Sequence, residues 1–161
     1  MTSVAIFVDV QNLYYTTRSA FQRNVDYNRL WAQLTHGREV VKAVAYAIDR
    51  GDPKQREFQN ILRAIGFEVR LKPFIQRADG SAKGDWDVGI TIDALESGAS
   101  ADVVVLASGD GDFDLLVQRL RDGMGKRVEV YGVTRLTAAS LIQAASQFYP
   151  IEGDLLLGNG R

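Results

Sequence analysis

The chain has 161 residues, of which 46% are apolar and 24% charged, and its net charge at pH 7 is −1. This length and composition are typical of one compact domain and exclude a histone-like basic protein and a disordered chain. With no cysteine and one histidine, His36, the chain has no disulfide scaffold, thiolate zinc site or cysteine nucleophile. The sequence shows no signal-peptide pattern and no run near the roughly 20 apolar residues that span a bilayer, so we expect a soluble, cytoplasmic protein without membrane contacts.

The first half of the chain alternates between strand and helix patterns. Residues 4–10 are almost continuously apolar around Asp9, as in a strand that is buried on both faces. Residues 26–37 carry apolar side chains at helical spacing between a capping Asp and a terminal Gly. A second strand is predicted at 40–48, and a helix follows Asp52 and ends near residue 66.

The same alternation continues in the second half. Residues 67–71 alternate apolar and charged side chains, which predicts a half-exposed strand. Residues 74–84 are polar with two glycines and predict a loop, and a helix is expected over about 87–97. Residues 103–106 form the most apolar strand pattern, which indicates a place near the middle of the sheet. A helix with Phe113 on its apolar face follows.

The last elements complete an α/β pattern. A fifth strand is predicted at 126–131 and a last helix at 138–147, followed by a frayed tail. Regular alternation of strands and helices predicts a three-layer α-β-α fold with a mostly parallel central sheet. We therefore expect one domain over 1–150 and a C-terminal extension over 151–161.

Acidic and polar side chains gather at the expected carboxyl ends of two central strands. They are Asp9 and Asn12 after the first strand, Ser108, Asp110 and Asp112 after the fourth, and Asp85, Asp87 and Asp93 just before it. Sites in parallel sheets form at this edge, where the strand order reverses. Carboxylates placed together raise one another's pKa unless a cation is present, and oxygen-only ligands favour Mg²⁺ or Mn²⁺.

Several of these residues also have a purely structural interpretation. Asp112 and Asp87 are each placed to cap a helix, whereas Asp9 ends a strand without an evident capping duty. Asp93 is turned about 120° around the helix axis from Asp87, so a solvated or ion-paired Asp93 is slightly favoured. His36 falls in the last turn of its helix, where a cation is favourable.

Three blocks of sequence resemble the NYN domain, specifically its LabA-like branch within the PIN-like nuclease superfamily. They are IFVDVQNLY at 6–14, KGDWDVGITIDAL at 83–95 and VVVLASGDGDFDLLVQRLRDGMGKRVEVYG at 103–132. The blocks have the family's order and spacing, and the third is the most specific. The resemblance covers almost the whole chain and implies a PIN-like, Rossmann-like fold with metal-dependent cleavage of RNA.

The resemblance also implies roles for individual residues. The acids that would bind metal and carry catalysis are Asp9, Asp87, Asp110 and Asp112. Asp93 matches a further family acid and is added to the expected metal ligands. Asn12 and Ser108 would support this set and, with Lys83, form the expected substrate-binding residues. The family usually has Gly where Val10 stands, and one residue fewer before the acid of the second block, so Asp85 remains an alternative to Asp87.

The sequence therefore predicts a metal-dependent ribonuclease that uses Mg²⁺ or Mn²⁺. Two divalent ions about 3.5–4 Å apart support phosphodiester hydrolysis, although the sequence does not distinguish one ion from two. Residues 50–83 carry eight Lys or Arg against four acids, which would steer a polyanion or simply form a solvated face. Tyr14, Tyr15 and Trp86 are candidates for stacking on unpaired bases, though aromatics are more often core.

Other functions remain as alternatives. The first is a regulatory module that keeps the fold and binds RNA, single-stranded or structured, with little cleavage; the presence of all four acids favours an enzyme. A haloacid-dehalogenase-type enzyme would need a second Asp at position 11, where Gln stands, and a dinucleotide-binding domain would need glycines after the first strand. Asp110 and Lys126 only loosely imitate the Asp and Lys of a response regulator. The sequence leaves open whether the chain forms a homodimer.

Overall fold

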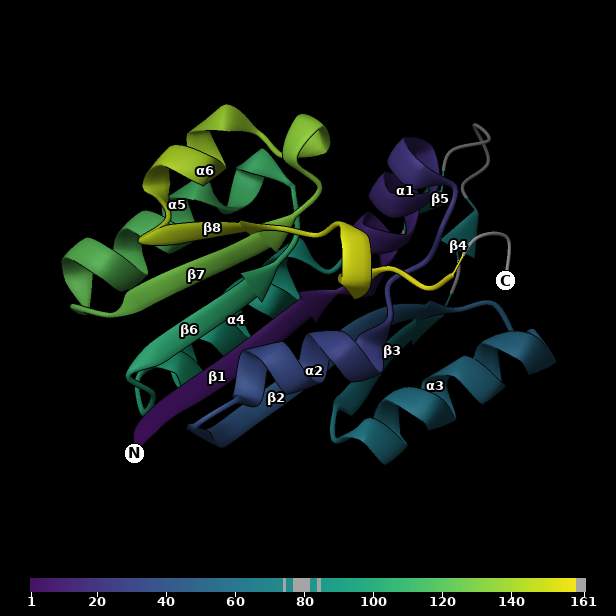
Figure 1. The fold of residues 1–161 in the computed structure, drawn as a ribbon, viewed down its shortest axis with the longest axis horizontal. Coiled ribbons are helices and arrows are strands. Elements are labelled where there is room, and N and C mark those ends of the chain that lie inside the picture. Colours follow the sequence, from purple (N-terminus) through teal and green to yellow (C-terminus); the bar gives the residue numbers. More distant parts are fainter. Residues whose placement is uncertain (74, 77–81, 84, 159–161) are drawn as a thin grey trace.

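The centre of the molecule is a sheet of six parallel strands. The computed structural model describes residues 1–73, 75–76, 82–83 and 85–158. The strands are β1 (Thr2–Asp9), β2 (Arg38–Asp49), β3 (Glu68–Pro73), β6 (Val103–Ala107), β7 (Arg127–Gly132) and β8 (Gln147–Pro150). They lie in the order β3-β2-β1-β6-β7-β8, and every neighbouring pair is parallel (Figure 1). The sheet therefore grows outward in both directions from the central pair β1 and β6.

Helices cover both faces of this sheet, which confirms the expected three-layer α/β fold. The helices are α1 (Val10–Phe21), α2 (Tyr27–Thr35), α3 (Pro53–Ile65), α4 (Asp87–Gly98), α5 (Asp114–Gln118) and α6 (Ala139–Ala144). Side chains of α1, α2 and α3 pack into one core cluster, and those of α4, α5 and α6 into the other. Figure 1 shows α2 in front of the sheet and α4 behind it.

Strand β1 contributes to both core clusters. Val4, Ile6 and Val8 pack with α1 and α2, whereas Ala5 and Phe7 pack with α4. All five side chains are fully buried. A parallel strand with helices on both faces needs this continuous apolar run, which is why the sequence at 4–8 does not alternate.

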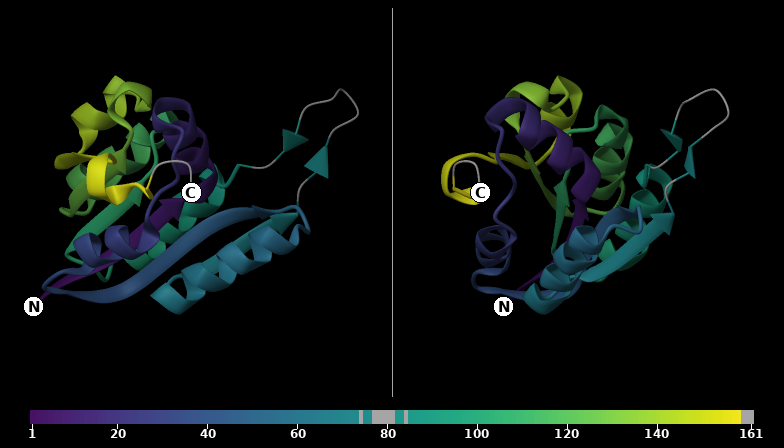
Figure 2. Two further views of the ribbon diagram at one scale, coloured as in Figure 1. Left: turned by 45° about the vertical axis from the view of Figure 1, so that its right-hand side comes forward. Right: turned by 90° about the vertical axis from the view of Figure 1, so that its right-hand side faces the viewer.

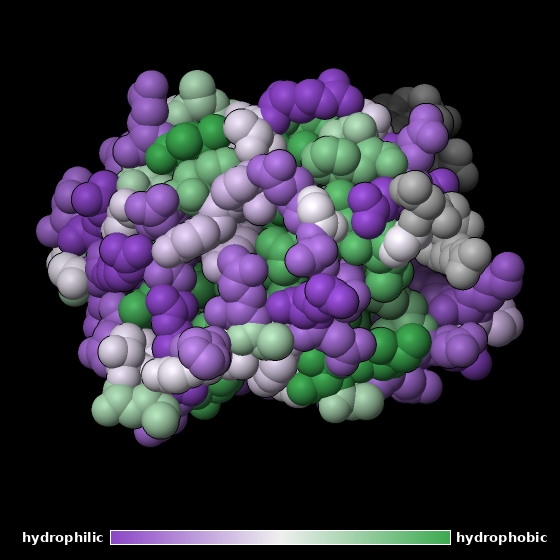
Figure 3. Space-filling view, viewed as in Figure 1, coloured by the Kyte–Doolittle hydropathy of each residue, from purple (hydrophilic) through white to green (hydrophobic). Residues whose placement is uncertain are grey.

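The face with α2 carries many polar side chains, with apolar surface showing between them (Figure 3). Within the described ranges, no helix is both long and apolar enough to cross a bilayer.

The N-terminal part of the chain contains one helix that the apolar pattern does not predict. Helix α1 begins immediately after β1, and Asp9 is its N-cap, since its side chain accepts a hydrogen bond from the Asn12 N–H. The expectation that Asp9 has no capping duty is therefore wrong. The expected helix after Asp26 is confirmed as α2, with Asp26 as its N-cap, and His36 follows its last residue as the C-cap.

Two other segments depart from the expected elements. Within the expected loop at 74–84, the described residues form two short antiparallel strands, β4 (Ile75–Gln76) and β5 (Ala82–Lys83), set apart from the main sheet (Figure 2). The expected helix that carries Phe113 is divided into a 3-10 turn over Gly111–Phe113, then α5, then a π-helical turn over Arg119–Gly123.

The C-terminal region also differs from expectation. The last helix ends at Ala144, and residues 147–150 form edge strand β8 instead. The tail beyond it is not frayed over 151–157, because Leu155 and Leu156 are buried and the Asp26 N–H donates to the Leu155 carbonyl at 2.8 Å. The tail thus packs against the start of α2, and residues 159–161 lie outside the described part. The proposed boundary at residue 150 stays a prediction.

Candidate functional site

The candidate site lies at the carboxyl edge of the sheet, between β1 and β6. These two strands are hydrogen-bonded neighbours, and their register pairs Val8 with Ala107. Asp9 and Ser108 are the next residues on each strand, so they meet at this edge. Because β2 lies on one side of the pair and β7 on the other, this is the point where the strand order reverses and where parallel sheets bind ligands.

Asp9 is buried at this edge and its side chain is held on both oxygens. Oδ1 accepts a hydrogen bond from the Asn12 N–H at 3.3 Å, and Oδ2 accepts one from the Ser108 hydroxyl at 3.1 Å. Only 8% of the residue is exposed. Burial raises the pKa of the Asp9 carboxyl to about 6, and these two hydrogen bonds limit the rise.

Asn12 and Ser108 connect α1 to the segment after β6. The Asn12 carbonyl oxygen Oδ1 accepts from the Gly109 N–H at 2.8 Å, and Ser108 Oγ accepts from the Asp110 N–H at 3.2 Å. Ser108 is fully buried, so it supports the acids and does not contact a substrate from this position. Gly109 is needed here because a Cβ would lie 2.9 Å from the Leu136 carbonyl oxygen.

Three carboxylates converge beside Asp9. Oxygen atoms of Asp87, Asp110 and Asp112 all lie within 4.8 Å of one another. Asp110 faces this group because it is the N-cap of the short 3-10 turn, where its Oδ1 accepts from the Asp112 N–H at 2.9 Å. Asp112 is therefore not the cap itself, which leaves its carboxylate available to a ligand.

Asp87 is the residue most affected by the neighbouring charges. It is the first residue of α4 and does not cap that helix, whose N-cap position is Trp86. Burial, followed by the charges of Asp110 and Asp85, raises the pKa of the Asp87 carboxyl to about 7. In the metal-free protein these carboxylates therefore repel one another.

The alternative between Asp85 and Asp87 has a structural answer. Both line a hollow of about 310 Å³, together with Asp9, Gln11, Asn12, Tyr15 and Asp110. Only Asp87 belongs to the three-carboxylate group, whereas Asp85 Oδ1 accepts from the Asp87 N–H at 3.1 Å. Asp85 thus supports the start of α4 and adds negative charge to the same hollow.

Asp93 is not brought into this group. Its Oδ2 accepts hydrogen bonds from the Tyr46 hydroxyl at 2.6 Å and from Arg70 Nη1 at 2.7 Å, and the residue is buried. The ion-paired interpretation of Asp93 therefore describes its position better than that of a metal ligand. The helical offset from Asp87 separates the two side chains, as the sequence predicts.

The aromatic residues expected to stack on bases differ in their positions relative to the hollow that Asp9, Asp87 and Asp110 line, which we call the acid hollow. Tyr15 is exposed and lines the acid hollow, whereas the Trp86 indole N–H donates to the Ala47 carbonyl at 2.9 Å and its ring packs on Tyr46. Trp86 therefore packs against β2 and holds the start of α4 in place. The side chain of Lys83 lies outside the described residues. Gln11, which the motif does not single out, lines the hollow because it is in the first turn of α1.

The chemistry of this donor set fits a divalent cation. All the donors are carboxylate oxygens, which are the ligands that Mg²⁺ and Mn²⁺ prefer. Across the described ranges, none of the ion pairs involves Asp9, Asp87, Asp110 or Asp112, so no Lys or Arg neutralises them. Three close carboxylates that have no ion-pair partner among the described residues are stabilised when a cation binds.

The sequence and the fold are both similar to those of known proteins. The NYN domain family model matches residues 3–152. The chain is 32% identical over 129 residues to the low amplitude and bright protein LabA of Synechococcus elongatus, which covers 73% of this chain and 67% of LabA. A crystal structure of a protein of unknown function from Vibrio parahaemolyticus is 58% identical, with a TM-score of 0.92, covering 97% of this chain and 96% of that one.

Proposed function

The chain belongs to the NYN domain family, and from this premise we propose that it is a metal-dependent ribonuclease that hydrolyses RNA phosphodiester bonds. The observation that carries the proposal is the convergence of Asp87, Asp110 and Asp112 within 4.8 Å beside buried Asp9. This arrangement supports a hydrolase with a divalent metal site, and we propose Mg²⁺ or Mn²⁺ as the ion.

The proposed ligands are Asp9, Asp87, Asp110 and Asp112. When bound, a divalent cation offsets charge on the phosphate and lowers the pKa of water. Asp9 is held rigidly by Asn12 and Ser108, so its carboxylate keeps one orientation. The two aspartates after β6 are fixed through backbone hydrogen bonds of the SGDGD segment.

The reaction itself is an exchange of one P–O bond for another. Water attacks the phosphorus, the bond to the leaving ribose oxygen breaks, and one proton of the water is transferred so that this oxygen leaves as a hydroxyl. The only histidine, His36, lies at the end of α2 and does not line the hollow. Among the described residues that line the hollow, the acid–base groups are therefore the carboxylates and the Tyr15 hydroxyl.

Val10, which departs from the family pattern, does not block the site. Its side chain is buried in the core cluster of α1 and does not line the acid hollow. Val10 instead lines the larger neighbouring hollow, so this departure from the family pattern leaves the acid hollow itself open.

A cleavage assay tests the proposal. Labelled single-stranded and hairpin RNAs are incubated with Mn²⁺, Mg²⁺ or EDTA, using wild type, Asp110→Asn and the control Asp114→Asn. Asp114 is a nearby acid outside the carboxylate group. We expect metal-dependent cleavage that Asp110→Asn reduces by about 100-fold or more, equivalent to about 3 kcal/mol of lost transition-state stabilisation.

Two other outcomes would overturn the proposal. Cleavage that survives in EDTA or in Asp110→Asn would place the activity elsewhere. RNA that is bound but not cleaved under every condition would favour the regulatory module with the same fold.

A further inference from the structure

A second and larger hollow adjoins the acid site. It has a volume of about 670 Å³, within the range of roughly 300–1,000 Å³ that is usual for ligand pockets. We call it the tyrosine groove, and its main lining residues are Gln11, Tyr14, Tyr15, Arg50, Lys54 and Phe58. It runs between α1 and the turn that connects β2 to α3.

We propose that the tyrosine groove binds an unpaired strand of RNA next to the phosphate that is cleaved. The inference rests on the proposed ribonuclease function and assigns the surface and the residues that hold the RNA strand beside the cleaved phosphate. Three features of the structure carry it, namely continuity with the acid hollow, exposed aromatic rings, and basic side chains on a fixed turn.

The first feature is continuity. Gln11 and Tyr15 line both the acid hollow and the tyrosine groove. They are four residues apart on α1 and therefore on one helix face. A chain molecule that places one phosphate at the acids extends directly into the groove.

The second feature is the pair of exposed tyrosines. Tyr14 is 53% exposed and Tyr15 is 57% exposed, although burying a tyrosine ring in a protein core lowers the free energy of the folded state. The two rings meet edge to face, with centroids 5.9 Å apart and planes at 73°. Aromatic faces that are open to solvent stack on bases whose own faces are free, which requires an unpaired strand.

The third feature is the charge on the opposite wall. Arg50 and Lys54 line the groove there, against a single acid, Asp52. Asp52 is the N-cap of α3 and its Oδ1 accepts from the Lys54 N–H. Lys54 forms no ion pair within the described part of the chain, so its ammonium group can contact a phosphate, whereas the acid hollow beside it is strongly negative. Phosphates next to the cleaved one would meet cations that the protein itself supplies.

The basic wall is held in place by its own hydrogen bonds. Gln55 Nε2 donates to the Ile48 carbonyl, and Gln55 Oε1 accepts from the Arg50 N–H at 2.8 Å. Asp49 Oδ1 also accepts from the Gly51 N–H at 2.9 Å. This turn thus presents its cations from a defined position, which lowers the entropic cost of binding.

Binding in EDTA tests the groove separately from cleavage. The probes are a labelled oligouridylate of about 12 nucleotides and an RNA duplex of the same length, a size within the usual range of single-strand sites. The variants are Tyr14→Ala, Tyr14→Phe and Lys54→Ala. Phe21→Ala and Arg56→Ala are matched controls, an exposed aromatic at the end of α1 and an exposed cation on α3, neither of which lines the groove.

We expect Tyr14→Ala to weaken binding of the unpaired strand about tenfold, and Tyr14→Phe to stay within about twofold of wild type, because stacking needs the ring and not the hydroxyl. Lys54→Ala should weaken binding and reduce the slope of log affinity against log salt by about 0.7, as for one lost phosphate contact. Both controls should bind like wild type, and wild type should prefer the unpaired strand to the duplex.

The failures of the two proposals are distinguishable. Equal binding by wild type, Tyr14→Ala and Lys54→Ala, or a preference for the duplex, would overturn the groove proposal even if wild type cleaves RNA with metal. Loss of binding in these variants, together with no metal-dependent cleavage by wild type, would retain the groove as an RNA site and overturn the ribonuclease.

Discussion

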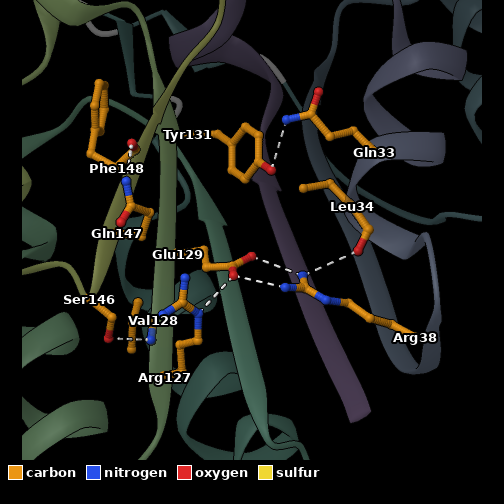
Figure 4. A network of polar contacts seen from close by, with 10 residues as sticks. All are labelled: Gln33, Leu34, Arg38, Arg127, Val128, Glu129, Tyr131, Ser146, Gln147 and Phe148. Carbon is orange, nitrogen blue, oxygen red and sulfur yellow. Dashed lines mark hydrogen bonds and ion pairs between the residues drawn. The ribbon is translucent and has the colours of Figure 1, made fainter. Parts of the chain in front are cut away.

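Two buried carboxylates at different places in the sheet have opposite environments. Glu129 of β7 is 1% exposed, and Arg38 binds both its oxygens at 2.9 and 2.8 Å while Arg127 Nε donates to Oε2 at 2.9 Å (Figure 4). Asp9 is nearly as buried but has only an N–H and a hydroxyl as donors. The pKa of the Glu129 carboxyl is lowered because hydrogen bonds from the two arginines outweigh its burial, whereas burial raises that of Asp9.

The difference indicates what each region is built for. At Glu129 the chain supplies its own cations, so the ion pair is part of the folded structure. At the carboxyl edge the chain brings Asp9, Asp87, Asp110 and Asp112 together, and no Lys or Arg among the described residues forms an ion pair with them. Asp93 follows the first pattern, because Arg70 neutralises it. We therefore expect a cation from solution to bind at this carboxyl edge, between β1 and β6.

The largest expected effect comes from removing a cation that the chain supplies. Arg38→Met leaves Glu129 buried with only Arg127, so we expect the free energy of unfolding to fall by about 3 kcal/mol. The control is Arg29→Met, which removes an exposed pair with Asp26 and should cost less than about 0.5 kcal/mol. Urea unfolding measures both free energies. An equal decrease in the two variants would show that the buried ion pair stabilises the fold no more than the exposed pair does.

Removing a charge from the acid cluster should have the opposite sign. Asp87→Asn replaces a carboxylate whose pKa is raised to about 7 by burial and neighbouring acids. We expect it to stabilise the metal-free protein at pH 8 by about 1 kcal/mol, a value discounted because Asp87 is partly exposed. Asp114→Asn should give no such gain. Destabilisation by Asp87→Asn would contradict the repulsion that we infer at this edge.

A smaller effect is expected from pH. A carboxyl with a raised pKa binds its proton more tightly in the folded state, so its charge costs stability as pH rises from the ordinary value of 3.8 to about 7. The advantage of Asp87→Asn over wild type should therefore shrink by about 0.5 kcal/mol when pH falls from about 8 to about 6. Urea unfolding of both proteins in EDTA measures this difference, and an advantage that grows toward pH 6 would be inconsistent with it.

Most of the fold and the acid set could be predicted from the sequence, because they depend on local patterns. Apolar strands and capped helices determine the α/β alternation, and Asp9 and Asp110 follow directly from strand ends. Helix α1 could not be predicted this way, since its buried side includes Thr16 and Thr17. Their hydroxyls donate to the carbonyls of Asn12 and Leu13, which allows polar residues on the buried side of the helix. The apolar side chains of α1 therefore do not recur at helical spacing along its whole length.

Other features that the sequence leaves open or does not predict depend on contacts between distant residues. Asp93 meets Arg70 and Tyr46, which are 23 and 47 residues away in the chain. Strand β8 is short and begins just after Ser146, which bonds Val128 of β7 through both its N–H and its hydroxyl. Such partners become visible only when the sheet is assembled.

The most direct test of the cation site is thermal unfolding with and without metal. Wild type and Asp110→Asn are melted in EDTA and in Mn²⁺ or Mg²⁺ at matched ionic strength. At about 100 times the dissociation constant, metal should stabilise wild type by about 2.7 kcal/mol, or roughly 5–10 °C in Tm, and Asp110→Asn much less. No shift in wild type, or the same shift in Asp110→Asn, would contradict the assignment of this edge as a divalent metal site.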